Sequence, residues 1–153
     1  MPSQQSANPF QAAVEQTPDL GASAYHTGLR ALSSYSSKIR LQNARALGSI
    51  YLEECVSGAR WDYGIGVQKS DGGAIAVWVE VHPAKTSEVD TVIKKLQWLK
   101  QWLRERAPLL NQMTPPDAFY WVATSGVNIL PDSSQARLLA THKIRMPREV
   151  LEL

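Results

Sequence analysis

Two carboxylates, Asp62 and Glu80, are the residues of this sequence best suited to chemistry. They lie in segments 60–69 and 74–82, where polar and apolar side chains alternate. Alternation of this kind on either side of a short Gly-containing stretch predicts a β-hairpin. Two carboxylates that lie close together either share a proton or hold a cation between them. They are therefore candidates for a magnesium site or for an acid–base pair.

The apolar side chains of the hairpin determine its register. Residues directly opposite each other in an antiparallel pair point to the same face of the sheet, and a slip of one residue would expose a whole apolar set. The two sets share a face only when Tyr63 pairs with Val79, Ile65 with Val77 and Val67 with Ile75. This parity excludes a two-residue Asp71-Gly72 turn and predicts a three-residue turn, Ser70-Asp71-Gly72, with Gly72 in the left-handed conformation.

The same register brings the two acids together. Asp62 then lies across from Glu80, with Cβ atoms roughly 4.5–5.5 Å apart. One of the two acids must take up a proton unless a cation lies between them. His82 follows two residues later on the same face, within side-chain reach. The neighbours on this face are small, namely Gly64, Gly66, Ala74 and Ala76. They leave room for either a helix or a ligand to approach closely.

The remaining pattern predicts an α/β fold with a mixed central sheet flanked by helices, in the order αβββαβ. Before the hairpin we expect a helix over 24–36, a break at Gly48 and a strand over 49–54. Pro83 should end the second strand of the hairpin, and a long helix should follow from a Ser87/Asp90 capping box to Pro108. The rest of the chain predicts a strand over 118–124, a short helix over 133–140 and an edge strand over 143–146. Residues 1–23, rich in Gln, Ser, Ala and Pro, predict a flexible leader before a single domain over 24–153.

The order of elements and the placement of the acids resemble the PD-(D/E)XK, or restriction-endonuclease-like, superfamily over residues 24–124. Asp62 matches the first acid of that family's motif, and Glu80 matches the second. The resemblance implies a nuclease-like hydrolase in which Asp62 and Glu80 bind Mg²⁺, or Mn²⁺, for phosphodiester hydrolysis of nucleic acid. His82 occupies the position of the motif lysine, so it would act as a base or an outer-shell ligand, and Lys85 or Lys95 would supply the missing positive charge.

Four basic residues, Arg30, Lys38, Arg40 and Arg45, lie in a stretch without acids between Tyr25 and Leu52. They are candidates for phosphate contacts in nucleic-acid binding, with a solvated helix face as the other interpretation. The net charge of +2 and the pI near 8.8 are compatible with nucleic-acid binding but argue only weakly for it.

Trp98 and Trp102 are four residues apart on the long predicted helix, beside its apolar stripe. They predict either a homodimer surface or a site that another segment of the chain covers. The first interpretation belongs to an alternative function, in which the chain is a binding or assembly module that kept the nuclease fold and lost catalysis. A third interpretation is a metal-free hydrolase that uses His82 and Glu80 as a general acid–base pair.

The composition excludes several other classes of protein. We expect no membrane span and no signal peptide, because the longest apolar runs are only as long as strands and the N-terminus lacks a basic and an apolar region. One cysteine, Cys55, excludes an internal disulfide and suits a reducing cytoplasm, and we interpret it as a small buried hydrophobic residue. Neither a P-loop nor a GxSxG motif occurs in the sequence.

Overall fold

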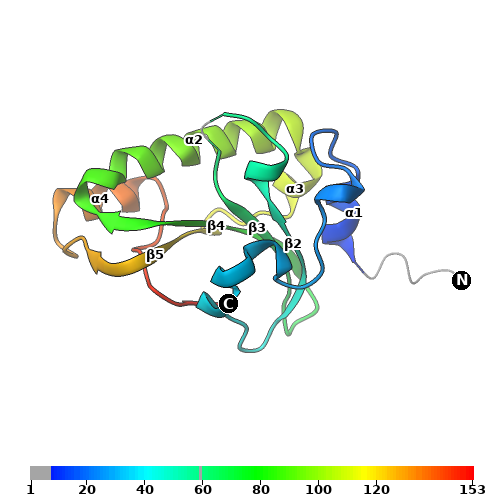
Figure 1. Ribbon diagram of the computed structural model, residues 1–153, viewed down its shortest axis with the longest axis horizontal. Coiled ribbons are helices and arrows are strands. Elements are labelled where there is room, and N and C mark those ends of the chain that lie inside the picture. Colours follow the sequence, from blue (N-terminus) through cyan, green and yellow to red (C-terminus); the bar gives the residue numbers. More distant parts are fainter. Residues whose placement is uncertain (1–7, 59) are drawn as a thin grey trace, which may run out of the picture.

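A computed structural model describes residues 8–58 and 60–153. Its centre is a mixed four-stranded sheet with helices on its faces, so the predicted α/β class is confirmed (Figure 1). The strands follow one another across the sheet in the order β2 (Arg45–Tyr51), β3 (Tyr63–Gln68), β4 (Ala74–Lys85) and β5 (Phe119–Asn128). The first three are antiparallel, and β5 runs parallel to β4 because helix α2 (Val89–Arg106) carries the chain back between them.

The hairpin has the register that its apolar side chains predict. Its pairs include Tyr63 with Val79, Ile65 with Val77 and Val67 with Ile75. Gly72 has a φ of 93°, in the left-handed region that favours glycine, and its N–H donates to the carbonyl oxygen of Lys69 at 2.9 Å. The three-residue turn is therefore confirmed, and the face that carries Glu80 is the face without the aliphatic set.

Helix α2 lies along one face of the sheet, with α1 (Pro9–Glu15) and α3 (Pro108–Gln112) near one of its ends and α4 (Ser134–Thr141) near the other (Figure 1). The helix buries the stripe that the sequence predicts, which comprises Val89, Val92, Ile93, Leu96, Leu99 and Leu103. The predicted capping box is wrong. A short 3₁₀ turn, η5 (Thr86–Glu88), leads into the helix, and its N-cap residue Glu88 makes no side-chain capping bond.

The prediction of a flexible leader is wrong from Asn8 onward, while residues 1–7 lie outside the described residues. Helix α1 is part of the core, and its Phe10 and Val14 are fully buried. The small residues of the hairpin explain why. A Cβ on Gly66 would lie 2.2 Å from the Phe10 ring, so α1 packs where only a residue without a side chain leaves room. The space that the sequence leaves open is therefore filled, in part, by the N-terminal helix.

The helix expected over 24–36 is replaced by two 3₁₀ turns, η2 (Ala22–Ala24) and η3 (Arg30–Lys38), the second of which has a kink at Ser33. Gly48 does not break the chain but lies inside β2, at a bulge. Its φ is 145°, and a Cβ there would lie 2.2 Å from the ring of Tyr25. The glycine is thus required by a tertiary contact, and β2 ends instead at the 3₁₀ turn η4 (Leu52–Glu54).

Two strand ends also differ from expectation. Strand β4 continues through Pro83 to Lys85, with a register shift between His82 and Ala84, because a bulge tolerates a residue that has no N–H. The edge strand predicted over 143–146 is only one isolated bridge, between Phe119 and Ile144. A separate two-stranded sheet forms instead from β1 (Ile39–Arg40) and β6 (Leu151–Glu152), which are parallel.

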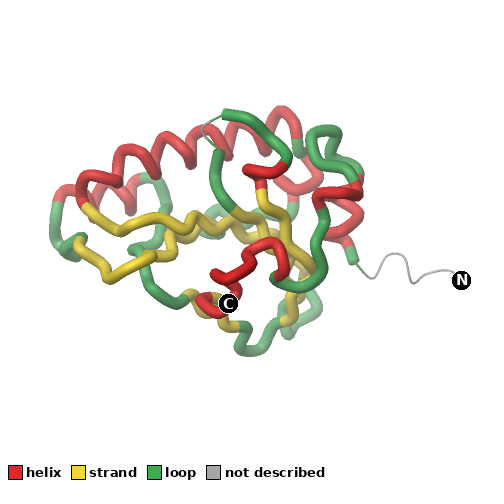
Figure 2. The backbone as a smooth tube through the Cα atoms, viewed as in Figure 1, coloured by secondary structure: helices red, strands yellow, loops and turns green. Residues whose placement is uncertain are grey.

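The two faces of the central sheet carry different cores. Helices α1 and α2 cover the face that bears Trp78, while η3 and the C-terminal segment cover the aliphatic face of β3 and β4 (Figure 2). Buried polar side chains are few among the described residues, and Glu80 is one of them, with an exposed fraction of 0%. Within the described part of the chain, every helix is too short or too polar to cross a membrane.

Candidate active site

Asp62 and Glu80 meet where the pairing of β3 with β4 ends. The backbone N–H of Asp62 donates to Glu80 Oε1 at 3.1 Å, and the N–H of Val81 donates to Asp62 Oδ2 at 2.9 Å. Side-chain oxygens thus bind two strand amides just beyond the last backbone pair, Tyr63 with Val79. The two acids lie on the same face of the sheet, as the register of the hairpin requires.

A cation from helix α2 lies against both acids. The ammonium of Lys95 donates a hydrogen bond to Glu80 Oε2, and its Nζ is 3.8 Å from Asp62 Oδ1. Lys95 lies beside the buried stripe of α2, so packing of the stripe on the sheet carries its side chain to the acids. The side chains of Lys95 and Asp62 are 20% and 18% exposed, which leaves this side of the site open to solvent.

Burial and mutual repulsion dominate the electrostatics of the two acids. Removal from water raises the pKa of Glu80 to about 8, and the charge of Asp62 adds to this rise, although Lys95 opposes it. Burial also raises the pKa of Asp62, while Lys95 and the Val81 amide act in the opposite direction. One ammonium therefore does not fully offset two carboxylates, and the site retains affinity for a proton or for a further cation.

His82 lies at the edge of this site, between two carboxylates. Its Nε2 is 2.6 Å from Glu88 Oε1, and its Nδ1 is 3.6 Å from Glu80 Oε2. Trp121 Nε1 donates to the backbone carbonyl of His82 at 2.9 Å, which fixes the strand at this point. Lys85 is exposed at the end of β4 and forms no ion pair with Asp62 or Glu80 in the described structure. Of the two lysines considered for the missing motif position, Lys95 is the one that reaches the acids.

Two carboxylates are the most that this site offers to a divalent cation from the described residues. Groups of three or more His, Cys, Asp or Glu residues arranged to hold a metal are absent from the residues that the structure describes. Magnesium in phosphoryl-transfer sites, however, commonly uses only one or two carboxylates and completes its shell with water and substrate phosphate. Asp62 and Glu80 supply such a pair of oxygen ligands, with Asp62 partly open to solvent.

The four basic residues predicted to contact phosphates do not gather at the acids. Arg30 and Lys38 belong to η3, which packs on the opposite face of the sheet, and Lys38 Nζ donates to the carbonyl oxygen of Ala123 at 3.4 Å. Arg40 lies in the separate β1–β6 sheet. Arg45 pairs with Gln68, at the end of β3 distant from Asp62. Their proximity in sequence reflects the path of η3, β1 and β2 and does not produce one patch beside Asp62 and Glu80.

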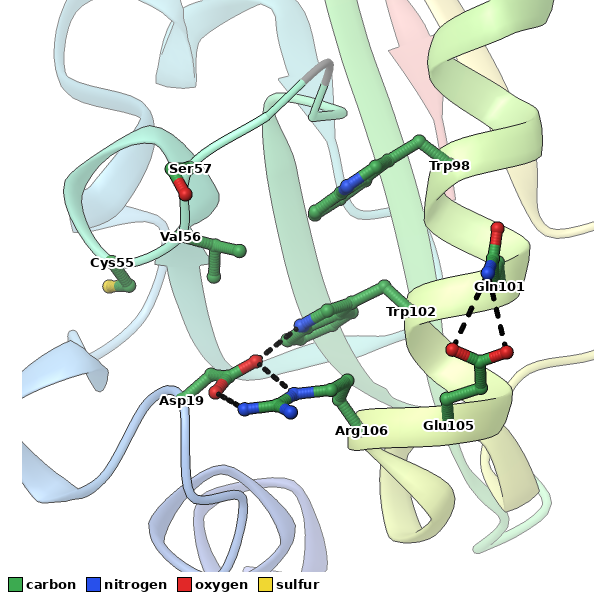
Figure 3. A pocket seen from close by; sticks show the side chains of 9 residues that line it. All are labelled: Asp19, Cys55, Val56, Ser57, Trp98, Gln101, Trp102, Glu105 and Arg106. Atoms are coloured by element: carbon green, nitrogen blue, oxygen red, sulfur yellow. Dashed lines mark hydrogen bonds and ion pairs between the residues drawn. The ribbon is translucent and has the colours of Figure 1, made fainter.

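The two tryptophans of α2 have different environments (Figure 3). Their rings stack with centroids 5.8 Å apart and planes inclined by 10°. Trp102 is only 5% exposed, because Asp19 and the loop after η4 lie over it, while Trp98 is half-buried. Of the two interpretations, a homodimer surface or a site covered by another segment of the chain, the second therefore holds for Trp102. A cavity of about 460 Å³ lies beside the pair.

Sequence reasoning missed two residues that complete these arrangements. Glu88 contacts His82 across the turn between β4 and α2, and Asp19 binds Trp102 from a segment interpreted as a leader. Neither contact follows from periodicity, because each joins a loop to an element whose approach only the folded chain defines. Lys95 was one of two candidates, and its place beside the apolar stripe was the signal that could have favoured it.

Comparison of the chain with protein-family models, with curated proteins and with solved structures gave no match in any of the three.

Proposed function

We propose that this chain is a metal-dependent phosphodiesterase of the restriction-endonuclease-like type that hydrolyses nucleic acid. The observation that carries the proposal is the convergence of Asp62, Glu80 and Lys95 from three different elements at one partly open site. Two acids and a lysine are the functional set of the family that the sequence resembles. Here the lysine comes from helix α2 instead of from the strand that carries the second acid.

The sheet supports the same proposal. Three antiparallel strands followed by a helix and a parallel fourth strand match the order of elements on which the resemblance rests. The raised pKa values of both acids, which follow from the same geometry, agree with the proposal, since groups with perturbed pKa values cluster at functional sites. A purely structural sheet gains nothing from two adjacent acids, because burying them costs solvation free energy that Lys95 only partly offsets.

Each residue then has a chemical role. Asp62 and Glu80 would hold the magnesium ion, which activates water and stabilises the leaving oxygen when it is bound. Lys95 would bind a non-bridging oxygen of the substrate phosphate and offset charge that develops there. His82 would accept or donate a proton at Nδ1, the ring nitrogen that faces Glu80, while Glu88 orients the ring through Nε2.

Cleavage and metal binding should be measured on the same set of variants. The wild type, Asp62→Asn, Glu80→Gln and Lys95→Ala are compared with Asp132→Asn, an exposed acid in the loop before α4. We expect the wild type and Asp132→Asn to cleave single-stranded or plasmid DNA, or RNA, in Mg²⁺ and to gain thermal stability from it. Asp62→Asn and Glu80→Gln should lose both properties. Lys95→Ala should lose cleavage but keep the thermal shift, because both metal ligands remain and a competing cation is gone.

The same data separate the other candidate functions. Equal Mg²⁺ shifts in the wild type and in Asp62→Asn would end the metal hypothesis. Cleavage that survives EDTA would favour the metal-free pair His82 and Glu80. A chain that neither cleaves nor responds to metal, but forms a dimer that Trp98→Ala dissociates in light scattering, would be the non-catalytic assembly module.

A further inference from the structure

The cavity beside Trp98 lies on the same side of helix α2 as Lys95. Lys95, Trp98 and Trp102 are spaced by three and four residues, so they project from one face of the helix. Trp98 is roughly 4.5 Å further along the helix axis than Lys95, at a rise of 1.5 Å per residue. The loop that carries Cys55, Val56 and Ser57 lines the cavity on its other side (Figure 3). Its volume of about 460 Å³ is in the range of small-molecule sites.

The lower part of the cavity is a fixed aromatic floor. Trp102 Nε1 donates to Asp19 Oδ2 at 2.9 Å, and the rings of Trp102 and Trp78 are nearly perpendicular, with centroids 6.3 Å apart and planes inclined by 82°. Arg106 donates to the same carboxylate through Nε at 2.9 Å and through Nη2 at 2.6 Å. Asp19 is thereby kept ionised, since the bonds from Arg106 and Trp102 lower its pKa. Trp102 is therefore a core residue, and Trp98 stacks on it as the outer, half-buried ring.

The rim of the cavity offers polar groups that are weakly engaged. Gln101 Nε2 lies 3.3 and 3.4 Å from the two carboxylate oxygens of Glu105, at the long end of hydrogen-bond distances. Both side chains are exposed and adjoin each other on the outer side of α2 (Figure 3). An amide next to a carboxylate presents N–H donors and several acceptors, which suits a partner that carries an amino group beside a ring nitrogen.

We propose that this cavity binds one unpaired base of the nucleic acid, stacked on Trp98, with its amino-bearing edge toward Gln101 and Glu105. The inference rests on the proposed function, because the base would belong to a nucleotide next to the phosphate held at Lys95. An axial offset of roughly 4.5 Å is on the scale of one nucleotide step, about 3.4 Å in a stacked strand. Tryptophan faces bind bases of any sequence, and the acceptors on the rim add a preference for a base with an exocyclic amino group.

Two properties of the substrate follow. The base must be outside a duplex to enter the cavity, so the preferred nucleic acid is single-stranded or locally opened. Adenine should bind better than thymine, because glutamine matches the N6–N7 edge of adenine and thymine has no amino group for the carboxylate of Glu105.

The test measures binding of fluorescein-labelled hexadeoxyadenylate and hexathymidylate by fluorescence anisotropy at fixed salt. EDTA is present so that metal-dependent cleavage does not occur. Trp98→Ala is compared with Trp98→Phe, which keeps an aromatic face, and with Tyr35→Ala, which removes a partly exposed ring from η3. We expect Trp98→Ala to weaken hexadeoxyadenylate binding at least about fivefold, the lower end of what stacking on one aromatic ring contributes. Trp98→Phe should retain most of the affinity, and Tyr35→Ala should retain all of it.

Glu105→Ala tests the rim separately. Loss of a negative charge should raise the affinity for both oligonucleotides, but the ratio of adenylate to thymidylate binding should fall toward one. An unchanged ratio overturns the role of Glu105, and equal affinity of the wild type and Trp98→Ala for hexadeoxyadenylate overturns the site itself. Thermal melting of each variant shows that the fold is intact.

Cleavage in Mg²⁺, measured on the same preparations, separates failure of this inference from failure of the proposed function. Cleavage by the wild type with unchanged binding in Trp98→Ala would leave the nuclease proposal standing and remove the base site. Binding that depends on Trp98 without any cleavage would support the base site and contradict the nuclease proposal.

Discussion

Two contacts between a carboxylate and a cation lie along one face of helix α2. The pKa of the carboxylate is raised at one contact and lowered at the other. At one contact, Glu80 accepts a hydrogen bond from Lys95, and its pKa is raised to about 8. At the other, Asp19 accepts two bonds from Arg106, and its pKa is lowered. A cationic partner alone therefore does not decide the state of a carboxylate in this protein.

Solvent and a second acid account for the difference. Glu80 is fully buried, so its charged form has lost its hydration, and Asp62 adds a like charge. Asp19 meets Arg106 at the surface, where the arginine side chain is 58% exposed, and no second acid contributes to its shift. Its three hydrogen bonds outweigh a small burial effect. The comparison distinguishes the Asp62/Glu80 site, where ionised carboxylates are held at a cost in free energy, from the Asp19–Arg106 contact, which only holds Trp102 in place.

The largest effect that would sharpen this comparison is expected from Lys95→Met, which keeps the length of the side chain and removes its charge. Without Lys95, the fully buried Glu80 and the partly exposed Asp62 should destabilise the fold by about 3–5 kcal/mol at a pH above 8, as found when one partner of a buried ion pair is removed. The cost should shrink below that pH, where Glu80 binds a proton. Urea unfolding across pH measures it, with the exposed Lys94→Met as control. A loss no larger than that of the control would mean that Lys95 behaves as a surface charge.

The pH dependence of stability should differ between the two acids. Because the pKa of Glu80 is about 8 in the folded chain and its ordinary value is 4.5, the folded state binds an extra proton between these values. Stability of the wild type should therefore fall as pH rises through this window, by up to roughly 1.4 kcal/mol per pH unit. Glu80→Gln should flatten the curve there. Parallel curves for the two proteins would contradict the burial argument.

A moderate effect is expected from Asp19→Ala. The indole N–H of Trp102 is buried and would lose its acceptor, which costs about 1–3 kcal/mol of folding free energy. Thermal or urea unfolding provides the measurement, and Asp132→Ala serves as an exposed aspartate control. If the two substitutions cost the same, Asp19 does not fix Trp102.

The smallest effect is expected from Arg106→Gln, since the guanidinium is at the surface. Its loss should raise the pKa of Asp19 toward the ordinary 3.8, so the contribution of this acid to stability should disappear at a higher pH during acid unfolding. Stability near neutral pH should change little. Titration of Asp19 by NMR in the variant checks the shift directly, and an unchanged pKa would assign the lowering to Trp102 alone.

The aliphatic face of the hairpin was predictable because side chains alternate with a period of two. One register only buries Tyr63, Ile65 and Val67 together with their partners, and that register also places Asp62 beside Glu80. The stripe of α2 was predictable for the same kind of reason, with a period of 3.6 residues.

Features that depend on close approach were not predictable. The sequence favours a break at Gly48, but this glycine is needed because a side chain there would collide with the ring of Tyr25. The small residues of the hairpin likewise do not indicate that Phe10 is the residue that covers Gly66. The segment that contains Phe10 and Asp19 has the composition of a leader, yet five buried side chains and one ion pair anchor it. Composition records average polarity, whereas the core needs only a few apolar residues in the right places.

By itself, the sequence determined that two acids share one face at the end of a hairpin, since local alternation leaves no other pairing that buries the apolar set. The tertiary structure alone decided which cation joins them. Lys85 is ten residues nearer to both acids along the chain than Lys95 is, but only the angle at which α2 packs on the sheet brings an ammonium to Glu80, and that ammonium belongs to Lys95. Side chains that meet across elements depend on the orientation of whole helices, which no local pattern encodes.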